Sequence, residues 1–233
     1  MDPLTPVATC VSSIWTSLWP CYHSITFGSV VMLIYSMIPV IVPVLVLVKL
    51  LWRRETSSLL VMLFIGAIML VCEGILKHAV KQERPAGSCD CSYGMPSSHS
   101  ATSYGLLVWT YLEVGFPIAG FEIASGARGW SNPQFRRVTY LVTSTVSFVP
   151  VPFSRVYFLY HTVAQVLVGI LVGAILALAW FGFLRGMVVP KAWLDKLVML
   201  RPFRAIRATN DYSPRPLQFN SSSPDMEEMD QYV

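Results

Sequence analysis

The sequence contains few charged residues, and this indicates the class of protein to which it belongs. Only 13% of its 233 residues are charged, against 54% that are hydrophobic, whereas a soluble domain carries about a quarter charged residues. Its five cysteines are an odd number without zinc-type spacing, which favours neither a full disulfide framework nor a zinc knuckle. The start of the chain lacks a basic segment before an apolar stretch, so it does not resemble a cleavable signal peptide. The composition predicts an integral membrane protein, and the length allows one compact bundle.

The sequence contains several long apolar runs with few charged residues. A spanning helix needs about 20 mostly apolar residues, and no stretch alternates with the period of two that is typical of a strand. We expect five spanning helices, over residues 27–52, 57–80, 99–119, 138–153 and 162–184. Prolines at 150 and 152 should end the fourth of them. The predicted fold class is all-α, a polytopic membrane helix bundle of five to six transmembrane helices.

Two segments outside these helices leave alternatives open. Residues 4–21 are uncharged but rich in Ser and Thr, which fits a sixth span, a re-entrant piece or an interfacial helix. Residues 185–200 mix apolar with basic side chains, the pattern of a helix lying on the membrane surface. The expected organisation is an N-terminal segment over 1–26, a membrane domain over 27–184, a basic interfacial helix over 185–207 and a disordered, acidic tail over 208–233.

The basic residues are unevenly shared between the two ends of the predicted helices. Of the 17 Lys and Arg residues, 13 fall on one side of the predicted membrane. The other four are Lys77, Lys81, Arg84 and Arg155. Because cytosolic loops are the ones enriched in Lys and Arg, we expect the tail to lie in the cytosol. The four remaining basic residues are then expected at the lumenal or extracellular face.

Two polar clusters border the second and third predicted spans on that minority side. Lys77 and Arg84 are seven residues apart, two helical turns, so their side chains leave one face. Basic residues at a helix end also reach for lipid headgroups, and this explains the pair equally well when it is taken alone. Ser97 and Ser98 are typical helix caps beside His99. A helix N-terminus is, however, also a site for anions.

The third cluster joins the fourth and fifth predicted spans. It contains Arg155, followed by His161 and Gln165, which are four residues apart at a helix start. A lone histidine at a membrane edge is usually an interfacial residue. Three clusters on one side indicate an anion-binding site rather than separate interfacial residues, because cations that lie close together repel one another unless an anion lies between them. Arg and Lys suit phosphate, and two histidines supply a nucleophile and a proton donor. The set predicts a phosphoryl-transfer site that uses no metal and no other cofactor.

The spacing within these clusters resembles that of a known family. The motifs Lys-x6-Arg-Pro, Pro-Ser-x-His and Ser-Arg-x5-His resemble the three-part signature of the type 2 phosphatidic acid phosphatase superfamily, and the resemblance covers residues 27–184. Within that superfamily, Tyr-Gly-Met-Pro-Ser-Ser-His-Ser and Ser-Arg-Val-Tyr-x-Leu-Tyr-His-Thr are most similar to the dolichyl diphosphatases. The resemblance implies hydrolysis of dolichyl (polyprenyl) diphosphate at the lumenal face of the endoplasmic reticulum membrane, in dolichol recycling for N-glycosylation. It implies this lipid and membrane lipids as partners, and no nucleic acid.

The resemblance also implies a role for each matching residue. His161 would attack phosphorus and form a phosphohistidine, and His99 would protonate the departing oxygen. The phosphate-binding residues would be Lys77, Arg84, Ser97, Ser98 and Arg155. Glu73 lies one helical turn before Lys77 and is expected to pair with it. Gln165 stands where the family has Asp; it is expected to accept a hydrogen bond from His161 without adding charge.

Two other functions fit the same residues. A phosphatase of phosphatidate or of a sphingoid phosphate would need the same headgroup chemistry. A non-catalytic lipid-phosphate binder is suggested only by Gln165. Cys89 and Cys91 fall in the same predicted lumenal loop, where either a pairing with Cys10 or Cys21 or a free thiol is compatible with an oxidising compartment.

Overall fold

The structure, a computed structural model, describes residues 26–88, 90, 92–116 and 133–212. Within these ranges the chain forms helices and no strand, which confirms the all-α class. The helices are α1 (Phe27–Arg53), α2 (Thr56–Met69), η2 (Leu70–Leu76), α3 (Lys77–Val80), α4 (Ser98–Gly115), α5 (Pro133–Phe148), α6 (Val151–Tyr157), α7 (Val163–Phe183), η3 (Leu184–Val188), α8 (Trp193–Met199) and α9 (Arg201–Ala205). The segment 4–21, the cysteines at 10, 21, 89 and 91, and the tail from 213 lie outside the described residues.

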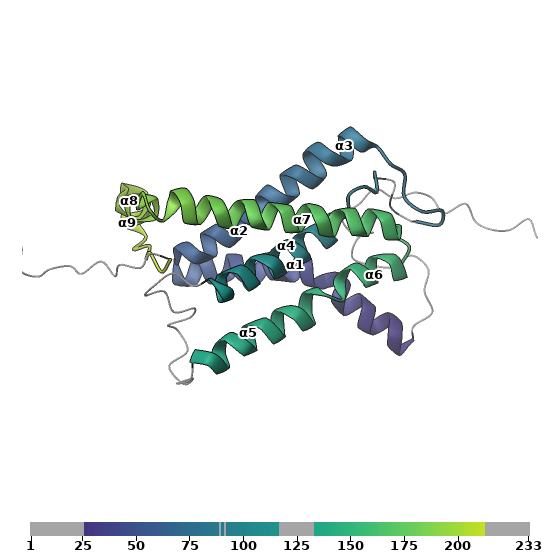
Figure 1. Cartoon of the computed structure of the whole chain (residues 1–233), viewed down its shortest axis with the longest axis horizontal. Helices are drawn as coiled ribbons and strands as arrows, with labels where there is room; N and C mark the ends of the chain where they lie inside the picture. Colours follow the sequence, from purple (N-terminus) through teal and green to yellow (C-terminus); the bar gives the residue numbers. More distant parts are fainter. Residues whose placement is uncertain (1–25, 89, 91, 117–132, 213–233) are drawn as a thin grey trace, which may run out of the picture.

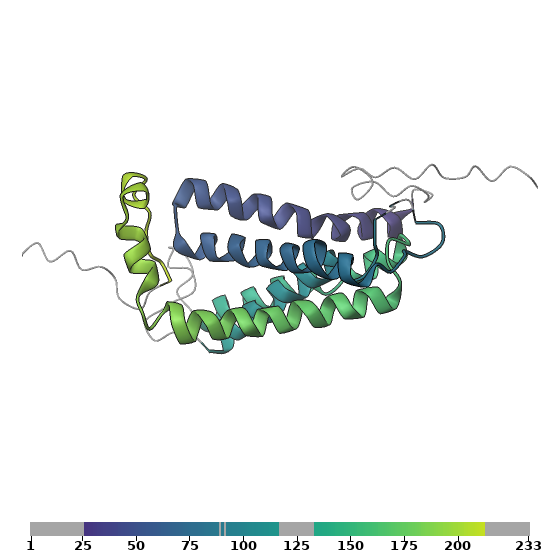
Figure 2. The same ribbon diagram turned by 90° about the horizontal axis from the view of Figure 1, so that it is seen from above.

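The long helices lie side by side along the bundle (Figures 1 and 2). Among the described residues, three continuous helical stretches are long and apolar enough to cross a membrane: Phe27–Arg53, Thr56–Val80 and Val163–Val188. Helices α4 and α5, the latter followed by α6, lie where the third and fourth spans were predicted, but neither is among these three stretches. Val48 and Leu51 on α1 and Leu171 on α7 are 55%, 68% and 59% exposed. Apolar surface of this extent suits lipid rather than water, so the chain is a membrane protein.

Prolines end the fourth predicted span, as expected. Helix α5 ends at Phe148, Pro150 precedes α6, and Pro152 lies in the first turn of α6. Proline is tolerated there because the N–H groups of a first helical turn have no partner within the helix. The chain therefore restarts as a short helix, and this helix contains Arg155.

The predicted interfacial helix over 185–207 is divided in the structure. Arg185 belongs to η3, which extends α7 to Val188. A turn with Ala192 at a φ of 51° follows, and α8 and α9 lie across the end of the long helices (Figures 1 and 2). Pro190 and Pro202 interrupt a continuous helix because each lacks a backbone N–H.

The first residues of the predicted disordered tail are fixed to the bundle. The N–H of Thr56 donates to the carbonyl oxygen of Thr209 at 3.1 Å. Asp211 accepts a hydrogen bond from the N–H of Ser57 at 2.8 Å, at the start of α2, where the helix dipole favours a carboxylate. Tyr212 is only 3% exposed. The prediction of disorder is therefore wrong for 208–212, because these residues have specific partners that composition does not reveal.

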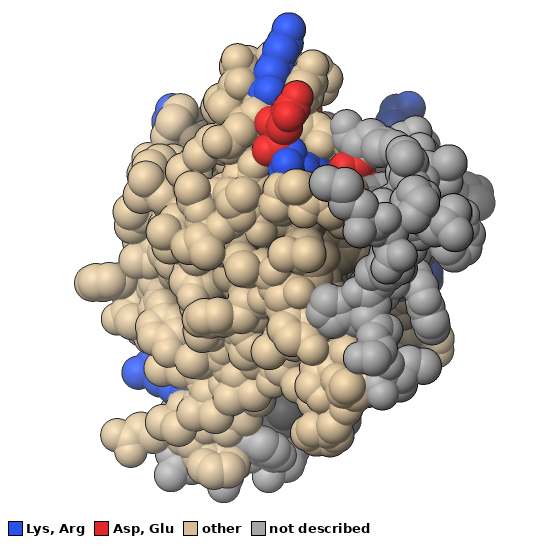
Figure 3. Space-filling model, turned by 90° about the vertical axis from the view of Figure 1, so that its right-hand side faces the viewer, with Lys and Arg blue, Asp and Glu red and all other residues tan. Residues whose placement is uncertain are grey.

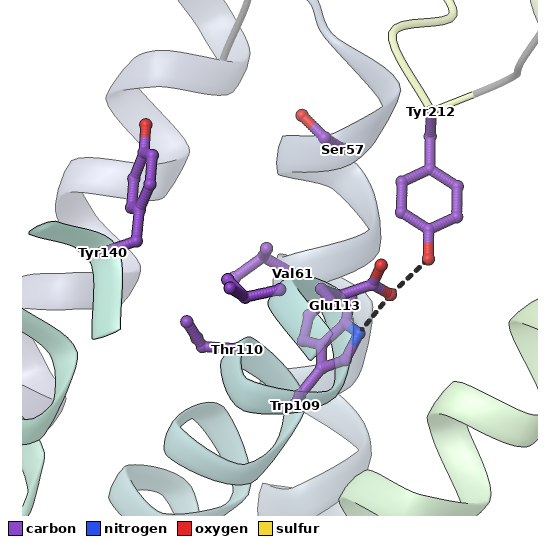
Figure 4. Close-up of a pocket in the computed structure, with 8 residues that line it drawn as sticks. Ser57, Val61, Trp109, Thr110, Glu113, Tyr140 and Tyr212 are labelled. Carbon is purple, nitrogen blue, oxygen red and sulfur yellow. Dashed lines mark hydrogen bonds between the residues drawn. The ribbon is translucent and has the colours of Figure 1, made fainter. Parts of the chain in front are cut away.

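A cavity of about 220 Å³ lies beside Tyr212, toward the end of the bundle that carries α8 and α9. The wall is mostly apolar, with the carboxylate of Glu113 at its edge (Figure 4). Glu113 accepts hydrogen bonds from Trp109 Nε1 at 2.9 Å and from the Tyr212 hydroxyl, and it pairs with Arg185 at 2.7 Å. The described residues that line the cavity include no histidine or cysteine, and the candidate chemistry lies at the other end.

Helices α4 and α7 approach closely along a stripe of small residues. Gly169 and Gly173 are four residues apart on α7. A Cβ atom at Gly169 would lie 2.5 Å from the carbonyl oxygen of Ser97, and one at Gly173 would overlap the carbonyl oxygen of Ala101. Small residues at this spacing let two helix backbones approach in a membrane. Because α4 begins after Ser97 and α7 begins two residues after His161, this packing also fixes the spacing between two of the three polar clusters.

Candidate active site

The three polar clusters lie at the same end of the bundle, where α3 and α6 are found (Figure 1). The charges of Arg84, Arg155 and Lys77 all act on the ring of His161. The same three cations, together with His161, act on the ring of His99. The structure thus brings both predicted histidines and the three predicted cations into one electrostatically coupled site.

The ring of His161 is buried, at 2% exposure, and both of its nitrogens have partners. Nδ1 lies 2.8 Å from the carbonyl oxygen of Gly94, and Nε2 lies 3.2 Å from Nη1 of Arg84. A carbonyl oxygen only accepts and a guanidinium only donates, so the proton is on Nδ1 and the lone pair is on Nε2. Burial, followed by the charges of Arg84, Arg155 and Lys77, lowers the pKa of His161 well below 6.5. The imidazole is therefore neutral at pH 7, with its lone pair on Nε2.

Gln165 and this ring form hydrogen bonds to other partners, so the expected hydrogen bond from His161 to Gln165 is wrong. The Gln165 Oε1 atom accepts from the N–H of Thr162 at 3.1 Å and closes a capping box at the start of α7. Its Nε2 atom donates to the carbonyl oxygen of Glu83 at 2.7 Å and to Oε1 of Gln82 at 3.1 Å. Both polar atoms of the Gln165 side chain are therefore bonded to the helix cap and the neighbouring loop rather than to His161, the partner that the sequence suggested.

The guanidinium of Arg84 joins the loop before α4 to the segment that carries His161. In addition to His161, Nη1 donates to the carbonyl oxygen of Tyr160 at 2.7 Å. Nε donates to the Ser92 carbonyl oxygen at 3.0 Å, and Nη2 donates to Ser92 Oγ and pairs with Asp90, both at 2.8 Å. Burial raises the pKa of Asp90, but the hydrogen bond from Ser92 and the charge of Arg84 outweigh it and lower the pKa below its usual value. Asp90 thus stays ionised; nothing in the sequence singled it out.

Lys77 and Arg155 reach the site from two different helices. Lys77 on α3 is 5% exposed and pairs with Glu73 at 2.8 Å, so the predicted pairing is confirmed. Arg155 on α6 is 2% exposed; its Nη1 donates to Ser36 Oγ on α1 at 2.7 Å. Its guanidinium lies 4.2 Å from the centre of the Tyr160 ring, an arrangement that stabilises a cation.

Two polar atoms of this site are buried and have no hydrogen-bond partner among the described residues. They are Nε2 of His99 and Nε of Arg155. Buried polar atoms are normally paired, and each exception calls for an explanation. A ligand that presents oxygen atoms to both residues is one explanation, and it agrees with the chemistry that the sequence predicts.

The two predicted serines are both buried at the start of α4, at 0% and 5% exposure for Ser97 and Ser98. Ser97 is the helix cap, and its Oγ accepts from the N–H and the hydroxyl of Ser100 at 3.5 and 3.0 Å. The backbone N–H of Ser97 donates to the carbonyl oxygen of Gln165 at 3.1 Å. The cap therefore fixes α4 to α7, and the N–H groups of the following turn have no partner within the helix.

The cations of the site are largely hidden from the surface. The side chains of Lys77 and Arg84 are each 6% exposed. Figure 3 looks onto this end of the bundle; the part of the face that it colours is mainly uncharged, with basic and acidic atoms near the upper edge and further basic atoms at the lower left. The positive charges of Lys77 and Arg84 are thus mostly enclosed by protein.

Comparison of the sequence with known proteins gives the same family relationship that the motifs predict. Residues 56–186, more than half of the chain, match the PAP2 superfamily. The chain is 34% identical over 162 residues to "Dolichyldiphosphatase 1" of Homo sapiens, a match that covers 66% of this chain and 64% of that protein. It is 28% identical over 207 residues to "Dolichyldiphosphatase" of Saccharomyces cerevisiae, covering 84% and 80% of the two chains. It is 30% identical over 148 residues to "Lipid phosphate phosphatase gamma" of Arabidopsis thaliana, covering 60% and 59%.

The match to the human relative spans less than two thirds of that protein's length. No solved structure gives a significant match to the chain. The family match covers all three polar clusters, from Lys77 to Gln165. The predicted resemblance is therefore confirmed, and the chain belongs to the PAP2 superfamily.

Proposed function

We propose that this chain is a diphosphatase of the endoplasmic reticulum membrane that hydrolyses dolichyl, or another polyprenyl, diphosphate to the monophosphate and phosphate. The observation that carries the proposal is the state of His161: a buried, neutral imidazole whose Nε2 faces Arg84. The substrate class rests on the relatives from Homo sapiens and Saccharomyces cerevisiae, which carry the name dolichyldiphosphatase. The product would serve dolichol recycling for N-glycosylation.

In the first step, Nε2 of His161 attacks the terminal phosphorus of the diphosphate. A bond from Nε2 to phosphorus forms, and the bond from phosphorus to the bridging oxygen breaks. His99, whose protonated form the bound anionic diphosphate favours, gives a proton to the departing oxygen, so that the lipid leaves as its monophosphate. Water then gives a proton to the now neutral His99 and attacks the phosphohistidine; the bond from phosphorus to Nε2 breaks, and phosphate and neutral His161 are released. Arg84 donates to Nε2 at 3.2 Å before the attack and turns this N–H to a phosphoryl oxygen once Nε2 is bonded.

The three buried cations stabilise the charge that develops on the transferring group. Lys77, Arg84 and Arg155 stand in low-dielectric surroundings, where a fixed charge acts more strongly than it does in water. The N–H groups of the first turn of α4, beginning at Ser98, add donors at the positive end of a helix dipole. With this charge supplied by side chains, the mechanism uses no metal ion.

The distribution of basic residues sets the sidedness that we propose. The ends of α1 and α7, with α8 and α9, carry most of the basic residues that the structure describes, and the histidines lie at the other end. By the tendency of basic loops to stay in the cytosol, the active site faces the lumen. The C-terminal tail is then cytosolic.

Acid pH should inactivate the enzyme only below the usual titration range of histidine. Nucleophilic attack needs neutral His161, and burial with the nearby cations holds its pKa well below 6.5. Because the neutral form persists as the pH falls, kcat at saturating substrate should be maintained through pH 6.5 and should decline at lower pH. A profile of kcat against pH tests this, and a loss of activity centred at or above 6.5 contradicts it.

A direct comparison of substrates tests the proposed function. Purified protein in detergent is given polyprenyl diphosphate or phosphatidate at equal concentration, with a chelator present throughout. Preference for the diphosphate is expected. Preference for phosphatidate would favour the general lipid phosphatase, which the Arabidopsis thaliana relative supports. Binding of both lipids without turnover of either would favour the non-catalytic binder.

A further inference from the structure

Both polar atoms of the Gln165 carboxamide form hydrogen bonds. Its oxygen accepts the N–H of Thr162, while its nitrogen donates to the carbonyl oxygen of Glu83 and to Oε1 of Gln82. The residue is 0% exposed, so water does not replace any of these bonds. A buried side chain in this place must therefore accept at one atom and donate twice at the other.

The loop that Gln165 binds is the one that holds Gly94. The N–H of Gly94 donates to the carbonyl oxygen of Gln82 at 2.7 Å. A Cβ atom at Gly94 would lie 2.5 to 2.7 Å from the carboxamide atoms of Gln165, so the Gly94 backbone lies directly on that group. The carbonyl oxygen of Gly94 in turn accepts Nδ1–H of His161 at 2.8 Å. Three hydrogen-bonded steps thus connect Gln165 to the nucleophile.

We propose that Gln165 is a positioning residue that sets the tautomer of His161 through the carbonyl group of Gly94. The inference rests on the proposed role of His161 as the nucleophile. Gln165 holds the Gln82–Glu83 segment by donating to it, this segment holds Gly94, and Gly94 keeps the ring proton on Nδ1. The lone pair is thereby kept on Nε2, the atom that attacks phosphorus. The backbone carbonyl does the orienting work that a carboxylate does in a Ser-His-Asp triad.

This proposal and the family pattern predict opposite effects of a carboxylate at position 165. If Gln165 were a weakened form of the family's Asp, Gln165→Glu would supply the missing charge to His161 and raise kcat. In the structure the second carboxylate oxygen would instead face two acceptors, at Glu83 and Gln82, and donate to neither. Loss of both donors in a buried site should lower kcat roughly tenfold or more at neutral and alkaline pH.

The pH profile separates positioning from general damage to the fold. Protonation of the carboxylate that Gln165→Glu introduces restores one donor, so the kcat of this variant relative to wild type should rise as the pH falls. Gln165→Met is the matched control, because it keeps the length but cannot titrate; its kcat should be low by a constant factor at every pH. The titratable or charged groups around position 165 are His99, His161, Asp90, Glu83, Lys77, Arg84 and Arg155, and dividing by the wild-type kcat leaves only the changes that the substitution itself causes. A ratio for Gln165→Glu that exceeds one, or that does not change with pH, overturns the proposal.

A second measurement needs no substrate. In protein labelled with ¹⁵N in histidine, the ring shifts of His161, assigned by comparison with His161→Ala, report which nitrogen carries the proton. Wild type should show Nδ1–H alone, and Gln165→Glu at alkaline pH should show a mixture of tautomers. A wild-type ring protonated on Nε2, or identical spectra for the two proteins, would refute the inference. If wild type turns over no lipid phosphate, the proposed function fails, whereas these spectra still decide the role of Gln165.

Discussion

Replacing His161 with Ala should abolish turnover and leave a folded protein that still binds anions. The loss in kcat should be about 10⁴-fold or more, the scale found when a catalytic residue is removed from a group that acts as a unit. Lys77, Arg84 and Arg155 remain, so the variant should still bind inorganic phosphate or vanadate. Removing the ring leaves the carbonyl oxygen of Gly94 without its 2.8 Å donor, which costs about 1–3 kcal/mol of stability. Turnover and the thermal shift with vanadate measure the two effects separately.

His78→Ala is the matched control for this experiment. His78 lies on α3 at the same end of the bundle, is exposed, and has its Nδ1 3.0 Å from the carbonyl oxygen of Glu73. Its replacement should leave kcat close to the wild-type value. Substantial turnover by His161→Ala would mean that another residue attacks phosphorus, and the proposed mechanism would then be wrong.

Gly173→Ala should damage both the stability and the chemistry. The added methyl group would overlap the carbonyl oxygen of Ala101, and a backbone atom cannot move aside without separating α4 from α7. Overpacking of this kind costs about 1–3 kcal/mol or more. Because the two helices begin beside His99 and His161, their separation should also increase the distance between the histidines and lower kcat. Thermal unfolding in detergent and kcat of the surviving folded protein measure the two effects.

Gly182→Ala supplies the comparison within the same helix. A Cβ atom at Gly182 meets nothing within 4 Å, and Ala favours a helix over Gly by about 0.5–1 kcal/mol. Its melting temperature should equal or exceed that of wild type. Equal melting temperatures for Gly173→Ala and Gly182→Ala would show that the α4–α7 contact is looser than the structure indicates.

The parts of the site that could be predicted are those in which side-chain chemistry and spacing coincide. Lys77 lies at a helix end as expected, and His99 follows a recognisable helix cap. Patterns of this kind predict which end of a helix a residue occupies, and apolar runs place the ends of several helices on the same side of a membrane. The meeting of the three clusters in the structure agrees with the helix ends that these patterns predict. The expectation that Arg84 leaves the same helix face as Lys77 is wrong, because α3 ends at Val80 and Lys81 has a positive φ.

The parts that could not be predicted depend on the backbone or on tertiary contacts. Gly94 acts through its carbonyl group, which every residue type has, so no residue pattern indicates it. Gln165 has the expected spacing from His161, but the cap on Thr162 and the loop at Glu83 compete for its two polar atoms. Tyr212 lies in a stretch of tail-like composition, and its hydrogen bond to Glu113, which is 99 residues away in the sequence, forms only in the folded chain.

The burial of the three site cations has a consequence for how a substrate is captured. Mobile ions in physiological salt screen a charge beyond about 8 Å, so these enclosed cations act on an anion chiefly once it has come close to the site. Steering of a distant anion through water would therefore contribute little to the association rate, and the rate should depend only weakly on ionic strength. A lipid does not need such steering, since it diffuses in the plane of the bilayer. Its anionic head is kept at membrane depth by its own tail, and the search for the site takes place in two dimensions.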